Sequence, residues 1–157
     1  MGALLLKNHY DKAKRSRAEK EDPEGAEWIC DLIGELLKDW TPRSYDTEDE
    51  YAEALFRYLK RAVELELDED EREVEIELRP DTDEGRPDLL IDDLLALELK
   101  INPNGSERDR CIGQCSRYSR EWVTWIILIG TPSHVVRKME EVLASKELHY
   151  IDIVQFL

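Results

Sequence analysis

The stretch of residues 86–101 constrains the fold of this chain more than any other part of the sequence. It contains two short apolar segments separated by Asp92 and Asp93, which is typical of a β-hairpin in both composition and length. Side chains alternate along a strand, so Glu98 and Lys100 would project from one face of the second strand. Its other face would be apolar, with Leu97, Leu99 and Ile101.

Asp88 opens the first strand of this hairpin. A turn at Asp92 and Asp93 would bring it beside the part of the second strand that holds Glu98 and Lys100. Two buried carboxylates repel each other unless a cation or a proton lies between them. The sequence therefore predicts a divalent metal bound by Asp88 and Glu98 through oxygen ligands, with Lys100 alongside.

The length of 157 residues, or 18.4 kDa, predicts one domain of ordinary size. No apolar run approaches the roughly 20 residues that a membrane span requires, so no membrane association is expected. The apolar residues 3–6 are too few for a signal peptide. Cys30, Cys111 and Cys115 are an odd number without a disulfide framework, which favours a reducing, cytoplasmic location.

The formal net charge of −15 argues against non-specific binding to nucleic acid, which depends on Lys and Arg side chains that neutralise phosphates. Acidic residues are concentrated at 68–71 and 81–84, away from the candidate site, and this local distribution weakens the objection. A strongly acidic surface is also an adaptation to a high-salt cytoplasm, where screening shortens the reach of charge. Composition alone leaves both explanations open.

The N-terminal part of the chain holds one basic cluster, residues 12–17. This cluster is either a solvated helix or arm, or an arm that contacts phosphates. The Pro-Glu-Gly segment at 23–25 is expected to break the chain. From residue 26 to 39, apolar side chains recur at helical spacing, which predicts an accessory helix that packs on the core.

A second helix is predicted over residues 47–63, with Thr47 as its N-cap and Glu50 completing a capping box. Its apolar face begins at Tyr51. Glu48 lies one turn before Tyr51, so its carboxylate would reach a site at the edge of the sheet. Alternatively, the acidic residues of this first turn only complement the helix dipole.

A third helix is expected after the hairpin, over residues 106–122, with Ser106 as its cap. Gln114 and Tyr118 lie one turn apart, so this helix would bring their polar tips beside the metal site. The same broad face holds two arginines, Arg110 and Arg117.

Further strands flank these helices. Residues 73–79 alternate between polar and apolar side chains, which predicts a half-exposed strand before the hairpin. Residues 122–130 form a continuous apolar run, the pattern of a strand covered on both faces. Pro132 and Ser133 would begin an amphipathic helix, and residues 149–154 would form the last strand.

From residue 47 onward, the predicted order is helix, three strands, helix, strand, helix, strand. With Pro87-Asp88 and Glu98-Leu99-Lys100 in the second and third strands, the chain resembles the PD-(D/E)xK nuclease superfamily. Gln114 and Tyr118 match the QxxxY motif of its RecB-like and related branches. The resemblance covers residues 47–130 well.

The resemblance implies an α/β, restriction-endonuclease-like core in which helices flank a mixed central sheet. Residues 47–157 would form this core, and residues 1–46 would be an N-terminal helical extension. Metal ligands would be Asp88, Glu98 and the backbone carbonyl of Leu99. The expected ion is Mg²⁺, with Mn²⁺ as a usable substitute, because both suit oxygen ligands.

The implied activity is metal-dependent hydrolysis of phosphodiester bonds in nucleic acid, with DNA expected as the substrate. Lys100 would orient or help deprotonate the attacking water and stabilise developing negative charge. The acid of the first helix would be Glu48, with Glu50 as the alternative. Two arginines would hold flanking phosphates, Arg110 and Arg117.

Two other interpretations remain open at this stage. The chain could be a non-catalytic nucleic-acid-binding or assembly subunit that keeps the nuclease fold, which the small size and the net charge of −15 favour. Alternatively, the charged residues could be ordinary exposed groups of an edge hairpin. If both strands of a duplex are cut, a homodimer with two sites would be the simplest arrangement.

Overall fold

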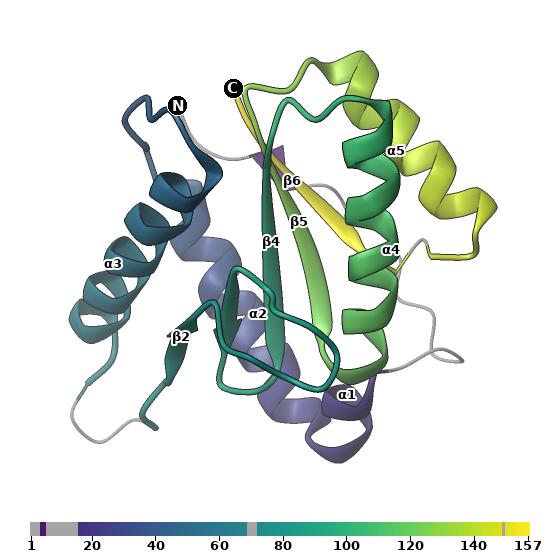
Figure 1. Cartoon of the computed structure of the whole chain (residues 1–157). Coiled ribbons are helices and arrows are strands. Elements are labelled where there is room, and N and C mark those ends of the chain that lie inside the picture. Colours follow the sequence, from purple (N-terminus) through teal and green to yellow (C-terminus); the bar gives the residue numbers. More distant parts are fainter. Residues whose placement is uncertain (1–3, 6–15, 69–71, 149) are drawn as a thin grey trace.

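A computed structural model describes residues 4–5, 16–68, 72–148 and 150–157. In this part of the chain, helices flank a mixed sheet of six strands in the order β1-β6-β5-β4-β3-β2 (Figure 1). The helices are α1 (Arg17–Glu21), α2 (Pro23–Lys38), α3 (Glu48–Glu66), α4 (Gly105–Glu121) and α5 (Ser133–Ser145). The strands are β1 (Leu4–Leu5), β2 (Ile76–Leu78), β3 (Leu89–Ile91), β4 (Leu95–Ile101), β5 (Val123–Ile129) and β6 (Asp152–Phe156). The predicted α/β class and the predicted element order from residue 47 onward are confirmed.

The hairpin at the centre of the sequence is present. Strands β3 and β4 are antiparallel, and Leu89 pairs with Leu97. Asp92 and Asp93 both have positive φ, at 57° and 53°, and the Leu94 amide donates to the Ile91 carbonyl oxygen. A pair of positive φ values is what a primed hairpin turn requires, and Asp tolerates this region better than most residues.

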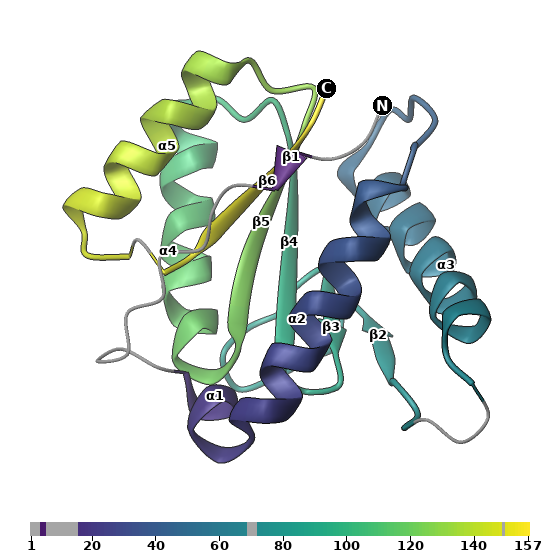
Figure 2. The same cartoon turned by 180° about the vertical axis from the view of Figure 1, so that it is seen from behind.

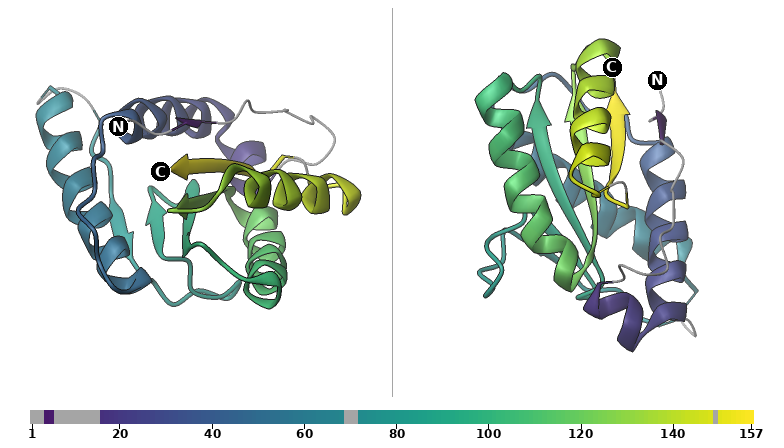
Figure 3. Two further views of the ribbon diagram at one scale, coloured as in Figure 1. Left: turned by 90° about the horizontal axis from the view of Figure 1, so that it is seen from above. Right: turned by 90° about the vertical axis from the view of Figure 1, so that its right-hand side faces the viewer.

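Strands β4, β5 and β6 run parallel to one another, while the outer pairs are antiparallel. The crossovers through α4 and α5 both advance in the same direction across the sheet, which places both helices on one face. Helices α2 and α3 cover the other face, as the view from above shows (Figure 3). Figure 2 shows this second face, with α2 in front of the strands and α3 beside β2.

The sheet therefore separates two apolar cores. The continuous apolar run of β5 contributes to both: Trp125, Ile127 and Ile129 pack toward α2 and α3, whereas Ile126 and Leu128 pack toward α4 and α5. This confirms the prediction of a strand covered on both faces. Helix α2 supplies Ile29, Ile33 and Leu37 to the first core, so it packs on the strands as the accessory helix was expected to do.

The predicted break at residues 23–25 is wrong, because this segment is the first turn of α2. Proline suits that position, since the first amides of a helix have no intrahelical acceptor. Asp22 is the N-cap and accepts from the Gly25 amide at 3.0 Å. A Cβ at Gly25 would lie 2.1 Å from Asp22 Oδ2, so only glycine leaves room for this cap.

Several predicted boundaries also shift. Helix α3 continues to Glu66, and α4 is capped by Asn104, which accepts from the Glu107 amide; Ser106 lies inside the helix. Strand β2 is limited to Ile76–Leu78, because it can pair only over the three residues of β3. The last strand begins at Asp152, and β1 adds a short antiparallel edge that the sequence did not predict.

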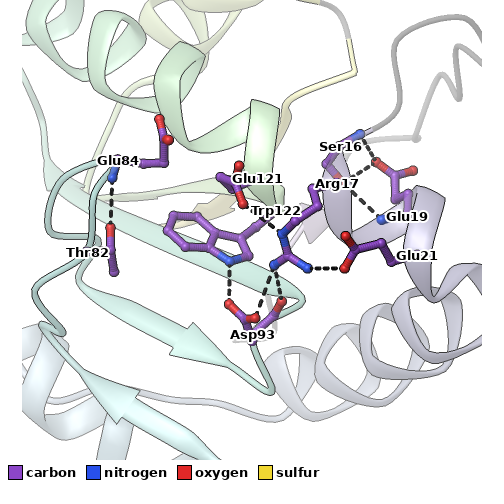
Figure 4. A network of polar contacts seen from close by, with 9 residues as sticks. All are labelled: Ser16, Arg17, Glu19, Glu21, Thr82, Glu84, Asp93, Glu121 and Trp122. Carbon is purple, nitrogen blue, oxygen red and sulfur yellow. Dashed lines mark hydrogen bonds and ion pairs between the residues drawn. The ribbon is translucent and has the colours of Figure 1, made fainter.

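One member of the basic cluster, Arg17, lies in the described part of the chain as the first residue of α1. Its guanidinium contacts the carboxylates of Glu21 (2.9 Å), Asp93 (3.1 Å) and Glu121 (2.7 Å). Trp122 Nε1 donates to Asp93 at 2.8 Å, which completes a network that joins α1, the hairpin turn and the end of α4 (Figure 4). The basic residues at 12–15 lie outside the described residues.

None of the described helices is long and apolar enough to span a membrane.

Candidate active site

Asp88 lies where β3 has not yet begun to pair. Leu89, the first residue of β3, lies opposite Leu97, so the Leu99 amide further along β4 has no partner on β3. The Asp88 carboxylate accepts from this amide instead, at 2.8 Å. The antiparallel ladder thus continues through a side chain, which anchors the Asp88 carboxylate to β4.

Glu48 acts in the same way one step further along β4. It is the first residue of α3, and its carboxylate Oε2 accepts from the Ile101 amide at 3.0 Å. Glu50 has a different partner, because its carboxylate accepts from the Thr47 hydroxyl at the exposed start of the helix. Of the two glutamates that the sequence left open, the structure brings Glu48 to β4 and leaves Glu50 at the cap.

Glu98 and Lys100 project from the same face of β4, as strand alternation predicts, while Leu97 and Leu99 pack in the first core. Lys100 Nζ lies 3.7 Å from Glu98 Oε1 and 3.6 Å from Glu48 Oε1. Glu98 is only 4% exposed, and its Oε2 has no hydrogen-bond partner among the described residues. One ammonium is therefore shared between two carboxylates, and one buried carboxylate oxygen is left unsatisfied.

The electrostatics of these groups follow from burial and mutual repulsion. Burial raises the pKa of both Asp88 and Glu98, and the charge of Asp88 raises the Glu98 pKa further. Burial lowers the pKa of Lys100, but the charges of Glu48 and Glu98 outweigh this effect and raise it overall. Three carboxylates with one ammonium favour the uptake of a proton or a cation.

The donor set can be compared with what a divalent ion needs. Among the described residues there is no group of three or more His, Cys, Asp or Glu side chains that could hold a metal. Mg²⁺, however, is commonly bound through one or two carboxylates and keeps several waters. Asp88 and Glu98 supply two carboxylates, and the Leu99 carbonyl lies on the same side of β4 as the amide that Asp88 accepts from. With the unsatisfied Glu98 oxygen, this set fits a hydrated Mg²⁺ or Mn²⁺.

Gln114 and Tyr118 lie on the side of α4 that faces the sheet. Tyr118 is buried, and its pKa is raised by burial and then by the charge of Glu98. Gly85 approaches the Tyr118 ring so closely that a Cβ there would lie 3.0 Å from Cε1. Gln114 Oε1 is buried and has no hydrogen-bond partner in the described part of the chain. Both side chains therefore point inward, toward the face that carries Glu98.

Arg110 and Arg117 are exposed on α4, and neither has a hydrogen bond or ion pair with another described residue. They are accessible, but the structure does not bring them into contact with the carboxylates. Cys111 and Cys115 are fully buried thiols in the second core. A hydrogen bond with Cys111, and then burial, raise the pKa of Cys115. Both thiols contribute to packing.

Arg79 is a residue of this region that the sequence did not single out. Its guanidinium lies 3.5 Å from Asp49 and 3.2 Å from Glu53, both on α3. It stands in an alternating acidic and apolar segment, where an arginine at a strand end is unremarkable. No local pattern could have found it, because its partners are 26 or more residues away in the chain.

The chain matches no family model. Searches of curated proteins and of solved structures found no match either. The resemblance to PD-(D/E)xK nucleases therefore stays a prediction, made from this chain's own residues: the element order, the positions of Asp88, Glu98 and Lys100, and the pair Gln114 and Tyr118 on α4.

Proposed function

We propose that this chain is a metal-dependent nuclease of the PD-(D/E)xK type, with a restriction-endonuclease-like core, that hydrolyses phosphodiester bonds in DNA. The observation that carries this proposal is the buried Glu98 carboxylate. It lies next to Asp88, shares a single ammonium with Glu48, and has an oxygen without a hydrogen-bond partner. A fold tolerates such an arrangement at a site that binds a cation more readily than as a structural element.

The proposed ligands are the Asp88 and Glu98 carboxylates and the Leu99 carbonyl. A bound divalent cation supplies charge neutralisation at the phosphate and makes water more acidic. Lys100 would orient the attacking water and stabilise charge that develops on the phosphate oxygens. Glu48, whose Oε1 lies 3.6 Å from Lys100 Nζ, would help to hold this ammonium in place.

The substrate has to approach a protein with a net charge of −15. Arg110 and Arg117 are exposed without carboxylate partners among the described residues, so their charges are available to phosphates. The acidic loop at 81–84 lies before β3 and does not include the ligands. Binding would therefore depend on a few arginines and the metal, and would weaken as salt increases.

The net charge also supports a second candidate function, a non-catalytic subunit that keeps this fold within a larger nucleic-acid complex. In that case the Glu48–Lys100–Glu98 cluster would be structural. The two functions differ in whether cleavage depends on the metal and on these side chains.

The test is cleavage of end-labelled single-stranded and double-stranded DNA by the purified chain, with Mg²⁺, with Mn²⁺ or with EDTA. We expect cleavage with either ion and none with EDTA. Asp88→Asn and Glu48→Gln should reduce it, the first by about 10³-fold and the second by about 10- to 100-fold.

Two matched controls are available in the same chain. Pro80-Asp81 repeats the dipeptide Pro87-Asp88, but the Asp81 side chain is 95% exposed, so Asp81→Asn should leave cleavage unchanged. Glu50→Gln likewise tests an acid of the same helix turn that does not reach β4. Cleavage that persists in EDTA, or that Asp88→Asn and Asp81→Asn alter equally, would contradict the metal-dependent nuclease proposal. No cleavage with either ion would favour the non-catalytic subunit.

A further inference from the structure

The backbone of Arg79 is tied to Asp88. Arg79 follows β2, and its amide donates to the Asp88 carbonyl oxygen at 2.8 Å, one step beyond the last β2–β3 pair. Its own carbonyl accepts from Arg86 Nε at 3.0 Å, which closes the loop between β2 and β3 at its base. The main chain at Asp88, the proposed metal ligand, is therefore fixed by a hydrogen bond from Arg79, the residue opposite it.

The side chain of Arg79 is tied to the helix that carries Glu48. Nη2 donates to Glu53 Oε1 at 3.2 Å, and Nη1 lies 3.5 Å from Asp49 Oδ1. Asp49 and Glu53 are four residues apart and lie in the first turns of α3, directly after Glu48. One residue thus connects the strand end beside Asp88 with the helix start that carries Glu48.

The backbone conformation of Arg79 supports a functional role for this connection. Its φ is +45°, a left-handed conformation that glycine adopts freely and that costs other residues roughly 1 kcal/mol or more. Nη1 is also buried without a hydrogen bond among the described residues. A side chain is therefore kept at a strained position where it reaches across to a neighbouring element.

We propose that Arg79 is a positioning residue that fixes the Asp88 and Glu48 carboxylates relative to each other on β4. The inference deepens the proposed nuclease function and rests on it. The two carboxylates accept from the amides of Leu99 and Ile101. If Arg79 is lost, α3 and the β2–β3 loop can move apart, and these two hydrogen bonds should open more often than the rest of the sheet.

Arg79→Gly is the sharpest variant, because glycine relaxes the positive φ while the contact to α3 is lost. Amide hydrogen exchange followed by NMR, without added metal, should show Leu99 and Ile101 exchanging about tenfold faster than in the unaltered chain. The Ile127 amide in the middle of β5 should be unchanged. Binding of Mn²⁺, followed by the loss of its free-ion EPR signal, should weaken by about tenfold, and kcat should fall more than KM changes.

The double variant Asp49→Ala with Glu53→Ala removes the same contact without altering the backbone at Arg79. It should reproduce the faster exchange at the same two amides. Arg79→Lys keeps the charge but not the forked geometry, so its amides should exchange more slowly than those of Arg79→Gly and faster than those of the unaltered chain. Arg61→Ala, an exposed arginine of α3, is the matched control. If Arg79→Gly instead unfolds the chain, the double variant decides.

The exchange measurement separates this inference from the proposed function, because it needs no activity. Unchanged exchange at Leu99 and Ile101 in the double variant would overturn the positioning role, even if the chain cleaves DNA. Faster exchange at these amides in a chain that neither binds Mn²⁺ nor cleaves DNA would support the positioning role of Arg79 and contradict the nuclease proposal.

Discussion

The two ends of strand β4 carry polar clusters of similar composition but different environment. At its start, Arg17 contacts three carboxylates, of which the Asp93 side chain is 68% exposed. At its end, Lys100 is shared by Glu48 and Glu98, and the Glu98 side chain is only 6% exposed. In both clusters, acids outnumber the cation.

The difference teaches that burial, rather than the ratio of charges, distinguishes a structural cluster from a candidate site. Water screens the excess negative charge around Arg17, so this network needs no further partner. At Glu98 the same excess is removed from water, and the pKa of the carboxyl group rises. A further cation would therefore stabilise the Lys100 cluster but not the Arg17 cluster.

The largest expected effect comes from neutralising the buried acid. Glu98→Gln should lower DNA cleavage by about 10³-fold. Mn²⁺ at about 100 times its dissociation constant should raise the free energy of unfolding of the unaltered chain by about 2.7 kcal/mol. The free energy of unfolding of Glu98→Gln should not change with Mn²⁺. Thermal unfolding with and without Mn²⁺ measures this difference. A variant that is stabilised by Mn²⁺ as much as the unaltered chain would remove the distinction between the two ends of β4.

Asp152 isolates the effect of burial, because burial alone raises its pKa to about 7 from an ordinary value of 3.8. Between these values the folded state binds more protons than the unfolded state, so stability falls as pH rises and levels off above about pH 7. From about pH 5.5 to about pH 8 the expected loss is about 2 kcal/mol, at 1.36 kcal/mol for each pH unit below 7.

Asp152→Asn should remove this part of the pH dependence, which urea unfolding at the two pH values would measure. Both pH values lie above the sequence pI of about 4.6, where the chain keeps its negative charge. If the free energy of unfolding of the variant has the same pH dependence as that of the unaltered chain, burial does not raise the pKa of Asp152. The same inference for Glu98 would then lose its support.

The smallest expected effect is at the exposed end of β4. Arg17→Met keeps the apolar stem and removes the charge, so it should lower the free energy of unfolding by about 1 kcal/mol. DNA cleavage should stay within about twofold, and the loss of stability should shrink in high salt. A fall in cleavage comparable to that of Glu98→Gln, with stability unchanged, would instead make the Arg17 network part of the functional site.

Patterns that are local in the chain were predicted correctly. The turn at Asp92 and Asp93 and the shared face of Glu98 and Lys100 follow from strand alternation, which depends only on neighbouring residues. The two-sided burial of residues 122–130 was equally evident from composition. Errors arose where a local signal has two meanings, as with Pro23, which can end one segment or begin a helix.

The sequence by itself determined the class of the fold, the order of its elements from residue 47 onward and which side chains share a face of β4. Only the tertiary structure decided that Glu48 rather than Glu50 reaches the Ile101 amide, and that Arg79 joins α3 to the loop before Asp88. The physical reason is range. Alternation and capping act over a few residues, whereas these contacts join a helix to residues 26 and 53 positions further along the chain.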